Sequence, residues 1–408
     1  MLFNKSIMTS FAGLSLINIL NIIVPIITMP YLSRVLTPTG YGVFLLFSTV
    51  YIFAFIIIDY SINITGVREI AEAQSDEEEN IIFRSLQSLR LLLSLIACFL
   101  SIVYIYYVDD QHLSLGYIFL NICTAIFGYY LSATWYHQGK QEMTILALSS
   151  LCSRIVQLLV IFCFVKEIKD INLALLANSL VFLIPGMVAA FYRKIKNNIG
   201  ISFSFSYKSV KVDLKRGFNA FIGDFAPNLY SNLPPLLIGL LATPAVFATY
   251  SLSLRIINIA GSFQLMMAKA IFPSVVKGEF TFKSMMIMNI IIGLIPVLLI
   301  IFLGNKIVYF LLGEGYAAVA EYLFYLAPTI LFASILFALT YGYFLPNKLD
   351  KEFRNLSLAV SVISAFVGYI MIYRIGVMGA ILMFVLARFL FMLSFMLYYL
   401  KVSTKHSK

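Results

Sequence analysis

The sequence predicts an all-α membrane protein with about twelve transmembrane helices. Hydrophobic residues make up 61% of the chain, and only 12% of its 408 residues are charged. The mean hydropathy is +0.94. No soluble domain could bury so much apolar surface, and the apolar runs are long enough to cross a bilayer as helices. We therefore expect lipid to surround most of this chain.

The predicted spans are runs of roughly 20 mainly apolar residues, separated by short polar breaks. Their ranges are 10–30, 41–59, 86–108, 113–134, 143–165, 172–192, 217–241, 246–270, 284–304, 322–345, 355–373 and 377–400. The first run has no small-residue cleavage site after a short apolar core. We interpret it as an uncleaved helix.

Lysine and arginine in the short loops predict the orientation. If the N-terminus is cytoplasmic, the basic residues left on the outer side are few; they are Arg34, Lys166, Lys169, Lys306 and Arg374. The inner loops hold most of the others, as the positive-inside rule requires. Both termini are therefore predicted to be cytoplasmic. The net charge of +10 is mostly this orientation signal, so no nucleic-acid surface is predicted.

A basic stretch at 193–216 separates two sets of six predicted spans. We interpret it as a cytoplasmic linker between an N-terminal lobe, residues 1–192, and a C-terminal lobe, residues 217–408. Because six is even, both lobes insert the same way up. This arrangement implies a parallel repeat related by a pseudo-two-fold axis along the membrane normal, with a central cavity between the lobes.

A short sequence echo supports the repeat. Thr37-Pro38 stands before the second predicted span, and Thr243-Pro244 stands at the same place before the eighth. An aromatic residue follows within four positions in each half. Two identities are a weak signal alone, and their equivalent placement raises their value.

Three arginines lie near the middle of predicted spans: Arg154, Arg255 and Arg388. Placing an arginine at the bilayer centre costs roughly 2.5–3.5 kcal/mol on insertion scales, so each must face protein or water. Asp224 is the only acid at a comparable depth, which leaves an excess of positive charge. A water-filled cationic cavity for a phosphate-bearing substrate would explain the excess. The alternative is that these arginines bind helix C-terminal carbonyls or fill packing gaps.

Other chemistry-bearing residues form no recognisable set. The four cysteines all lie in apolar runs without metal-ligand spacing; they are Cys98, Cys123, Cys152 and Cys163. The three histidines are far apart in sequence. No metal site, disulfide or cofactor is predicted. Trp135-Tyr136 ends the fourth span, where an interfacial aromatic belt is a better interpretation than a sugar-stacking site.

Two segments resemble one known family. The first is Pro-Tyr-Leu-Ser-Arg-Val-Leu-Thr-Pro-Thr-Gly-Tyr-Gly at 30–42, and the second is Leu-Leu-Gly-Glu-Gly-Tyr at 311–316. Ala320-Glu321 and Leu326-Ala327-Pro328 follow the second. Both resemble the Wzx-type polysaccharide (O-antigen) flippases of the multidrug/oligosaccharidyl-lipid/polysaccharide exporter superfamily. Thr37 departs from the pattern, since glycine is common before that proline.

The resemblance implies a flippase in the bacterial cytoplasmic (inner) membrane, taking part in lipopolysaccharide or other polysaccharide biosynthesis. Its cargo would be an undecaprenyl-pyrophosphate-linked oligosaccharide, moved by alternating access, with the pyrophosphate in the cationic cavity. The family also implies a cation gradient, H⁺ or Na⁺. Asp59 and Asp224 are the candidate coupling carboxylates. Other polysaccharide-assembly proteins are possible partners beside the membrane lipids, and we expect a monomer.

Two alternatives stay open at this point. A cation-coupled exporter of small drugs from the same superfamily would favour an acidic cavity, whereas this chain has the opposite sign. A membrane polymerase or ligase of surface polysaccharide would need a sizeable outer loop, and the longest predicted outer loop is only about 304–321.

Overall fold

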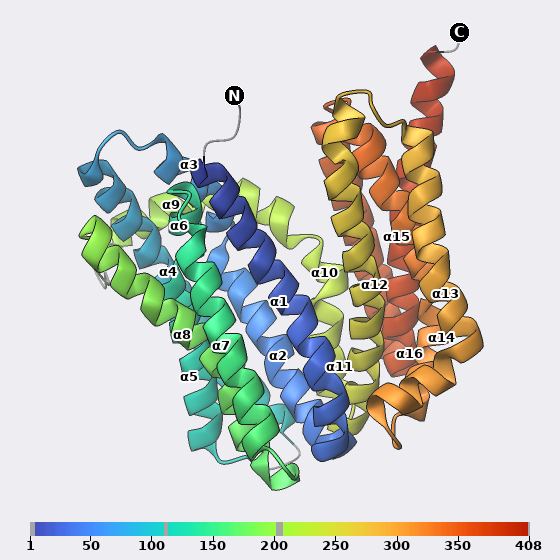
Figure 1. Ribbon diagram of the computed structural model, residues 1–408, viewed down its shortest axis with the longest axis horizontal. Helices are drawn as coiled ribbons and strands as arrows, with labels where there is room; N and C mark the ends of the chain where they lie inside the picture. Colours follow the sequence, from blue (N-terminus) through green and yellow to red (C-terminus); the bar gives the residue numbers. More distant parts are fainter. Residues whose placement is uncertain (1–4, 110–112, 201–206, 407–408) are drawn as a thin grey trace. The chain divides into compact units, whose positions relative to one another are not determined.

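The computed structural model describes residues 5–109, 113–200 and 207–406, and in these ranges all regular structure is helical (Figure 1). The helices of the first half are α1 Lys5–Val35, α2 Thr37–Asp59, α3 Ile62–Glu72, α4 Asp76–Val108, α5 Leu115–Ser132, α6 Thr134–Gly139, α7 Met143–Phe164, α8 Ile171–Asn197 and α9 Tyr207–Phe225. Those of the second half are α10 Asn228–Ser231, α11 Leu233–Leu241, α12 Pro244–Val276, α13 Phe282–Leu312, α14 Ala317–Leu326, α15 Pro328–Leu339 and α16 Asp350–His406. A 3₁₀ turn precedes α8, and a π-helical turn at Thr340–Phe344 follows α15.

Within those ranges, ten helical segments are long and apolar enough to cross a membrane. The prediction of an all-α, multi-pass membrane protein is confirmed. Eleven of the twelve predicted spans coincide closely with these segments, because α16 contains two of them. That helix is interrupted at Ile375 and Gly376, and Gly376 has a φ of 58°. Glycine suits this left-handed conformation, so the chain turns where the sequence predicted a short loop.

The predicted span at 217–241 is wrong as a single helix. The chain there forms the end of α9, the short α10 and the nine-residue α11. Prolines explain the interruption: Pro227 precedes α10, and Pro234 and Pro235 lie at the start of α11. A proline ring removes a backbone donor and clashes with the preceding turn, so a helix begins more readily at such residues than it passes through them.

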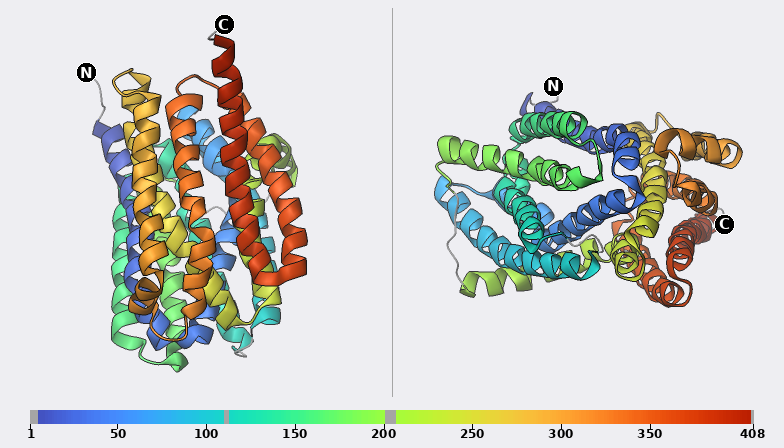
Figure 2. Two further views of the ribbon diagram at one scale, coloured as in Figure 1. Left: turned by 90° about the vertical axis from the view of Figure 1, so that its right-hand side faces the viewer. Right: turned by 90° about the horizontal axis from the view of Figure 1, so that it is seen from below.

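The chain divides into two compact units, Met1–Phe225 and Ala226–Lys408. The first contains α1 to α9 and the second α10 to α16. In each unit the long helices lie side by side as a bundle (Figure 2). Of the predicted linker at 193–216, residues 193–197 end α8 and 207–216 begin α9, which packs against α4; residues 201–206 lie outside the described residues.

Small residues permit close helix packing in the first unit. α5 and α8 are its most extensively packed pair, and Gly128 faces Gly186 where they cross. A Cβ added at Gly186 would overlap the carbonyl oxygen of Gly128, so the two backbones touch there. Close backbone approach of this kind drives helix association in lipid, where no hydrophobic effect acts between helices.

In the second unit, α13 packs against α15 around a buried polar contact. Gln264 of α12 donates from Nε2 to the hydroxyl of Ser334 at 2.9 Å, and Gly293 of α13 leaves room for both side chains. The Thr-Pro echo also has a structural counterpart. Pro38 is the second residue of α2 and Pro244 the first of α12, so both copies mark the start of a long helix.

Candidate functional site

Arg154 lies midway along α7 and is held by two amide side chains. Its guanidinium donates from Nη1 to Oε1 of Gln157 at 2.9 Å and from Nη2 to Oδ1 of Asn21 at 2.8 Å. Gln157 is one turn further along α7, and Asn21 comes from α1. Both acceptors are neutral amide oxygens, and they fix the orientation of the guanidinium.

A cavity of about 130 Å³ opens beside Arg154 within the first unit. Its polar lining comes from α1, α5, α6 and α7: Asn21, Tyr129, Ser132, Thr134, Ser150 and Arg154. This volume holds several water molecules. It is smaller than the ~300–1,000 Å³ of typical ligand pockets, so by itself it is a hydrated recess around a cation.

A chain of buried hydrogen bonds supports Arg154 from behind. Gln157 donates from Nε2 to Asn178 of α8 at 3.2 Å, and Asn178 donates from Nδ2 to Ser48 of α2 at 3.2 Å. Gln157 and Asn178 are both buried. Buried polar side chains that satisfy one another fix a single arrangement, so α2, α7 and α8 together set the position of the guanidinium.

Asp59, one of the predicted coupling carboxylates, ends α2 beside a buried arginine. Its Oδ2 accepts a hydrogen bond of 2.5 Å from the Tyr129 hydroxyl, and its Oδ1 lies 3.8 Å from Nη2 of Arg90. Arg90 is fully buried, whereas 18% of the Asp59 side chain is exposed. Tyr129 also lines the cavity beside Arg154. Tyr129 therefore contacts Asp59 and also lines the cavity that Arg154 lines.

Asp224, the second predicted carboxylate, lies near Asp59. The Ser61 hydroxyl donates to Oδ2 of Asp224 at 3.5 Å, and the two carboxylates interact electrostatically. Desolvation raises the pKa of Asp224 above its usual range, and the hydrogen bond from Ser61 lowers it in part. The structure thus brings together two acids that are far apart in sequence.

The backbone directly after Asp59 is strained. Tyr60 has a φ of 41° and Ser61 a φ of 61°, so two consecutive non-glycine residues occupy the left-handed region. Each such residue costs on the order of 1–3 kcal/mol and persists only where its surroundings hold it. Tyr60 is held through its hydroxyl, which donates to the carbonyl oxygen of Leu214 in α9 at 3.1 Å.

Further polar contacts hold α9 against α3 and α4 within the first unit. Ser85 donates to Asp213 at 2.5 Å, and Arg216 donates to Glu69 at 2.8 Å. Burial raises the pKa of Asp213, and the hydrogen bond to Glu69 raises the pKa of Arg216. The end of α9, and with it Asp224, is therefore positioned by α3 and α4.

Sequence reasoning missed the two most buried arginines. Neither Arg90 nor Arg193 is among the predicted site residues, although they are only 0% and 1% exposed. Arg90 donates to the carbonyl oxygens of Tyr129 and Tyr130, each at 3.1 Å. Arg193 donates to those of Leu131 and Ser132, at 2.6 and 3.0 Å.

These two arginines complete the end of α5. The last four carbonyls of a helix have no partner within it, and in α5 the guanidiniums satisfy all four. Positive charge at a helix C-terminus is also favourable for the helix dipole. One sequence signal could have found them: Arg90 lies inside the predicted span 86–108, and Arg193 directly follows the predicted span 172–192.

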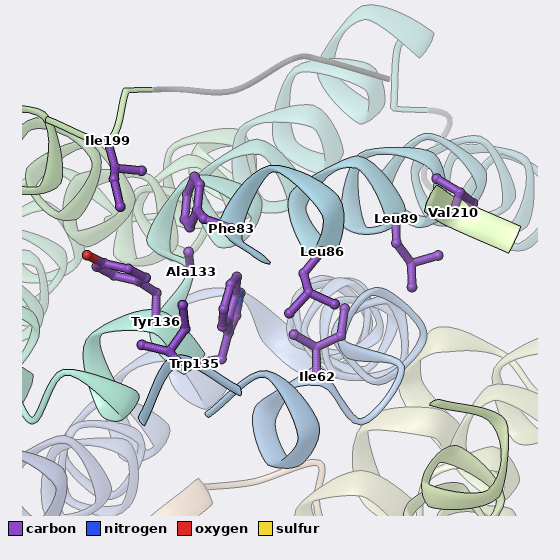
Figure 3. Close-up of a cluster of buried hydrophobic side chains, with 10 residues drawn as sticks. Ile62, Phe83, Leu86, Leu89, Ala133, Trp135, Tyr136, Ile199 and Val210 are labelled. Carbon is purple, nitrogen blue, oxygen red and sulfur yellow. The ribbon is translucent and has the colours of Figure 1, made fainter. Parts of the chain in front are cut away.

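A hydrophobic cluster surrounds this helix end (Figure 3). Trp135 and Tyr136 are 1% and 0% exposed, with ring centroids 5.7 and 5.4 Å from that of Phe83. Arg193 lies 5.3 Å from the Phe83 centroid. The interpretation of Trp135-Tyr136 as part of an interfacial belt is therefore wrong, because both rings pack inside the first unit.

Arg255 and Arg388 lie in the second unit, on α12 and α16. Both are half-buried. The guanidinium carbon of Arg388 is 5.2 Å from the centroid of the Phe384 ring. Among the residues that the structure describes, neither guanidinium makes a hydrogen bond or an ion pair. They differ in this respect from Arg90, Arg193 and Arg154.

Metal ligands are not gathered anywhere in the described ranges: no three His, Cys, Asp or Glu side chains there could share an ion. The cysteines of these ranges are free thiols, and the sulfur atoms of Cys98 and Cys123 lie 3.5 Å apart.

The chain is similar to a known protein family and to two known proteins. The family model of the polysaccharide biosynthesis proteins matches residues 7–279. A "Putative O-antigen transporter" of Shigella dysenteriae is 25% identical over 370 residues, which cover 89% of this chain and 92% of that protein. A protein of the same description from Escherichia coli (strain K12) is also 25% identical, over 84% of this chain and 85% of its own.

Solved structures show the same fold. The lipid II flippase MurJ in an inward closed conformation matches with a TM-score of 0.70 and 15% identity, covering 95% of this chain and 87% of MurJ. An inward-facing multidrug resistance MATE family transporter of the MOP superfamily matches with a TM-score of 0.66 and 13% identity, covering 93% and 96%.

The fold is thus the one that MurJ and the MATE family transporter share, a multi-pass bundle of membrane helices. The chain belongs to the polysaccharide biosynthesis protein family. Both relatives are described as transporters, and neither is described as a polymerase or ligase.

Proposed function

We propose that this protein is a flippase that moves an undecaprenyl-pyrophosphate-linked oligosaccharide, such as an O-antigen repeat unit, from the inner to the outer leaflet of the bacterial cytoplasmic membrane. Family membership and the two relatives described as O-antigen transporters support this cargo. MurJ, which has a similar fold, is described as a lipid II flippase, and this likeness supports a lipid-linked substrate.

One observation carries the proposal: Arg255 and Arg388 lie on long apolar helices, and within the described chain neither has a hydrogen-bond acceptor or an acid. A guanidinium at this depth needs an anion, a carbonyl or water. A pyrophosphate offers acceptor oxygens that suit the bidentate geometry of guanidinium. We therefore assign both arginines to the cargo headgroup.

Arg154 is proposed as the third cationic contact, from the N-terminal lobe. It lines a polar recess, and two amide side chains orient its guanidinium there. In this proposal the two lobes are related by a parallel pseudo-two-fold and enclose a central cavity. Arg154 contributes one wall of the cavity, and Arg255 and Arg388 contribute the other. Alternating access then exposes the headgroup first to the cytoplasm and afterwards to the outer side.

Coupling to a cation is proposed at Asp59 and Asp224. Two carboxylates that share a site bind H⁺ or Na⁺ more readily than one alone, because the ion relieves their mutual repulsion. Tyr129 contacts both Asp59 and the recess beside Arg154. Neutralising Asp59 would change the hydrogen bond of Tyr129. It would thereby change the lining of the recess beside Arg154.

A translocation assay tests the proposal. The purified protein is reconstituted into liposomes that carry a fluorescent undecaprenyl-pyrophosphate oligosaccharide in both leaflets, and a membrane-impermeant quencher then reports exchange between leaflets. We expect rapid exchange with the protein and almost none in empty liposomes. Exchange no faster than in empty liposomes would contradict the flippase. Efflux of small cationic drugs from the same liposomes would instead support the drug-exporter alternative.

A further inference from the structure

The second unit carries a groove that the proposed function does not use. It lies between the end of α13 and α14 and has a volume of about 510 Å³, within the range of ligand sites. A tight turn separates the two helices, with Gly313 at a φ of 84° and Gly315 at 95°. These glycines belong to the Leu-Leu-Gly-Glu-Gly-Tyr segment at 311–316, so that segment shapes the groove.

Two opposite charges lie in this groove, whose lining mixes apolar side chains with polar ones such as Asn305. Lys306 of α13 and Glu321 of α14 both line it, and both are exposed. At 1.5 Å per residue, Lys306 is about 9 Å from the last residue of α13 and Glu321 is about 6 Å from the first residue of α14. The two charges therefore lie at similar depths below the turn.

Aromatic side chains surround each charge. Phe302 and Phe310, one turn before and one turn after Lys306, are 77% and 76% exposed. Phe324, one turn after Glu321, is 58% exposed. A helix face with such residues is suited to contact lipid, where an uncompensated charge is costly.

The two charges do not neutralise each other. No ion pair joins Lys306 to Glu321, and in the part of the chain that the structure describes neither side chain makes a hydrogen bond. The groove thus presents one cation and one anion with a net charge of zero. Its complement is a ligand that carries both signs and has an apolar tail.

We propose that this groove binds a phospholipid with a phosphate and a primary ammonium in its headgroup, a phosphatidylethanolamine. The Lys306 ammonium contacts the phosphate, the Glu321 carboxylate accepts hydrogen bonds from the lipid ammonium, and the acyl chains lie along Phe302 and Phe324. The pyrophosphate of the proposed cargo does not fit this site, because Glu321 would repel a ligand with several negative charges. A choline headgroup fits less well, since it has no N–H to donate.

Native mass spectrometry of the full-length protein tests the proposal, with phosphatidylethanolamine, phosphatidylglycerol and phosphatidylcholine added at equal concentrations. We expect phosphatidylethanolamine to bind about tenfold more tightly than either other lipid, as one charge-assisted hydrogen bond of about 1.4 kcal/mol gives. E321Q should abolish that preference. K306A should weaken the binding of all three lipids.

Two further variants complete the design. The double charge exchange K306E/E321K keeps both signs in the groove and should restore much of the preference that either single change removes. K169A is the matched control, because Lys169 is 82% exposed and belongs to the first unit, whereas the groove belongs to the second; it should change nothing. Equal binding of the three lipids by the wild-type protein, or a preference that survives E321Q, would overturn the proposal. Translocation of the cargo is measured separately in liposomes without phosphatidylethanolamine. The proposed flippase function and the proposed lipid site are therefore tested independently.

Discussion

The arginines of the two units are held in opposite ways. At the end of α5 in the first unit, Arg90 and Arg193 are fully buried and satisfy four backbone carbonyls. In the second unit, Arg255 and Arg388 are half-buried, and no acceptor reaches them within the described ranges. The two pairs have the same side-chain chemistry and differ in their partners.

This difference separates structural arginines from arginines available to a ligand. The carbonyls of a helix end absorb the hydrogen-bonding capacity of a guanidinium, so an anion would gain little there. A guanidinium without an acceptor keeps that capacity. Depth alone, which is what the sequence offers, therefore does not identify a binding residue. Binding to helix C-terminal carbonyls, the alternative raised for the three predicted arginines, is instead what Arg90 and Arg193 do.

The largest expected effect is on stability at the end of α5. Arg193→Met removes both donors from the carbonyls of Leu131 and Ser132, and leaving each buried acceptor unpaired costs about 1–3 kcal/mol. We expect a strongly lowered Tm and low abundance in the membrane. Arg255→Met is the matched control and should change the Tm little. Equal losses of Tm in the two variants would remove the distinction between the two pairs.

The next effect concerns coupling at Asp59. Asp59→Asn removes the charge beside Arg90 and should abolish the acceleration of transport by an imposed cation gradient, while exchange without a gradient continues. Tyr129→Phe removes one hydrogen bond and should weaken the acceleration only in part. Rates in liposomes with and without a gradient check both variants. Full acceleration in Asp59→Asn would assign the coupling elsewhere.

The smallest effect is the pH dependence at Asp224. Desolvation raises the pKa of this carboxyl, so the folded protein binds its proton more tightly than the unfolded chain does. Stability should therefore fall as the pH rises through this pKa. The change should be less than about 1 kcal/mol, because the group is partly solvated. Asp224→Asn should flatten that part of the curve of Tm against pH, and an unchanged curve would show that another group is responsible.

Hydropathy predicted most of the helices because lipid requires long, continuous apolar runs. It failed at 217–241, where prolines divide an apolar run into short helices. It gave no role to Arg90 and Arg193, because the carbonyls that hold them belong to α5, which packs against α4 and α8 only in the folded chain. The proximity of Asp59 and Asp224 depends on the packing of α9, which no local pattern encodes.

The most direct test of the cationic site is the equilibrium affinity of the purified protein for an undecaprenyl-pyrophosphate oligosaccharide. Arg154→Ala, Arg255→Ala and Arg388→Ala should each weaken binding about ten- to a hundred-fold, as the loss of a charged hydrogen bond implies, with the Tm unchanged. Undiminished affinity in all three variants and in the triple variant would contradict the account.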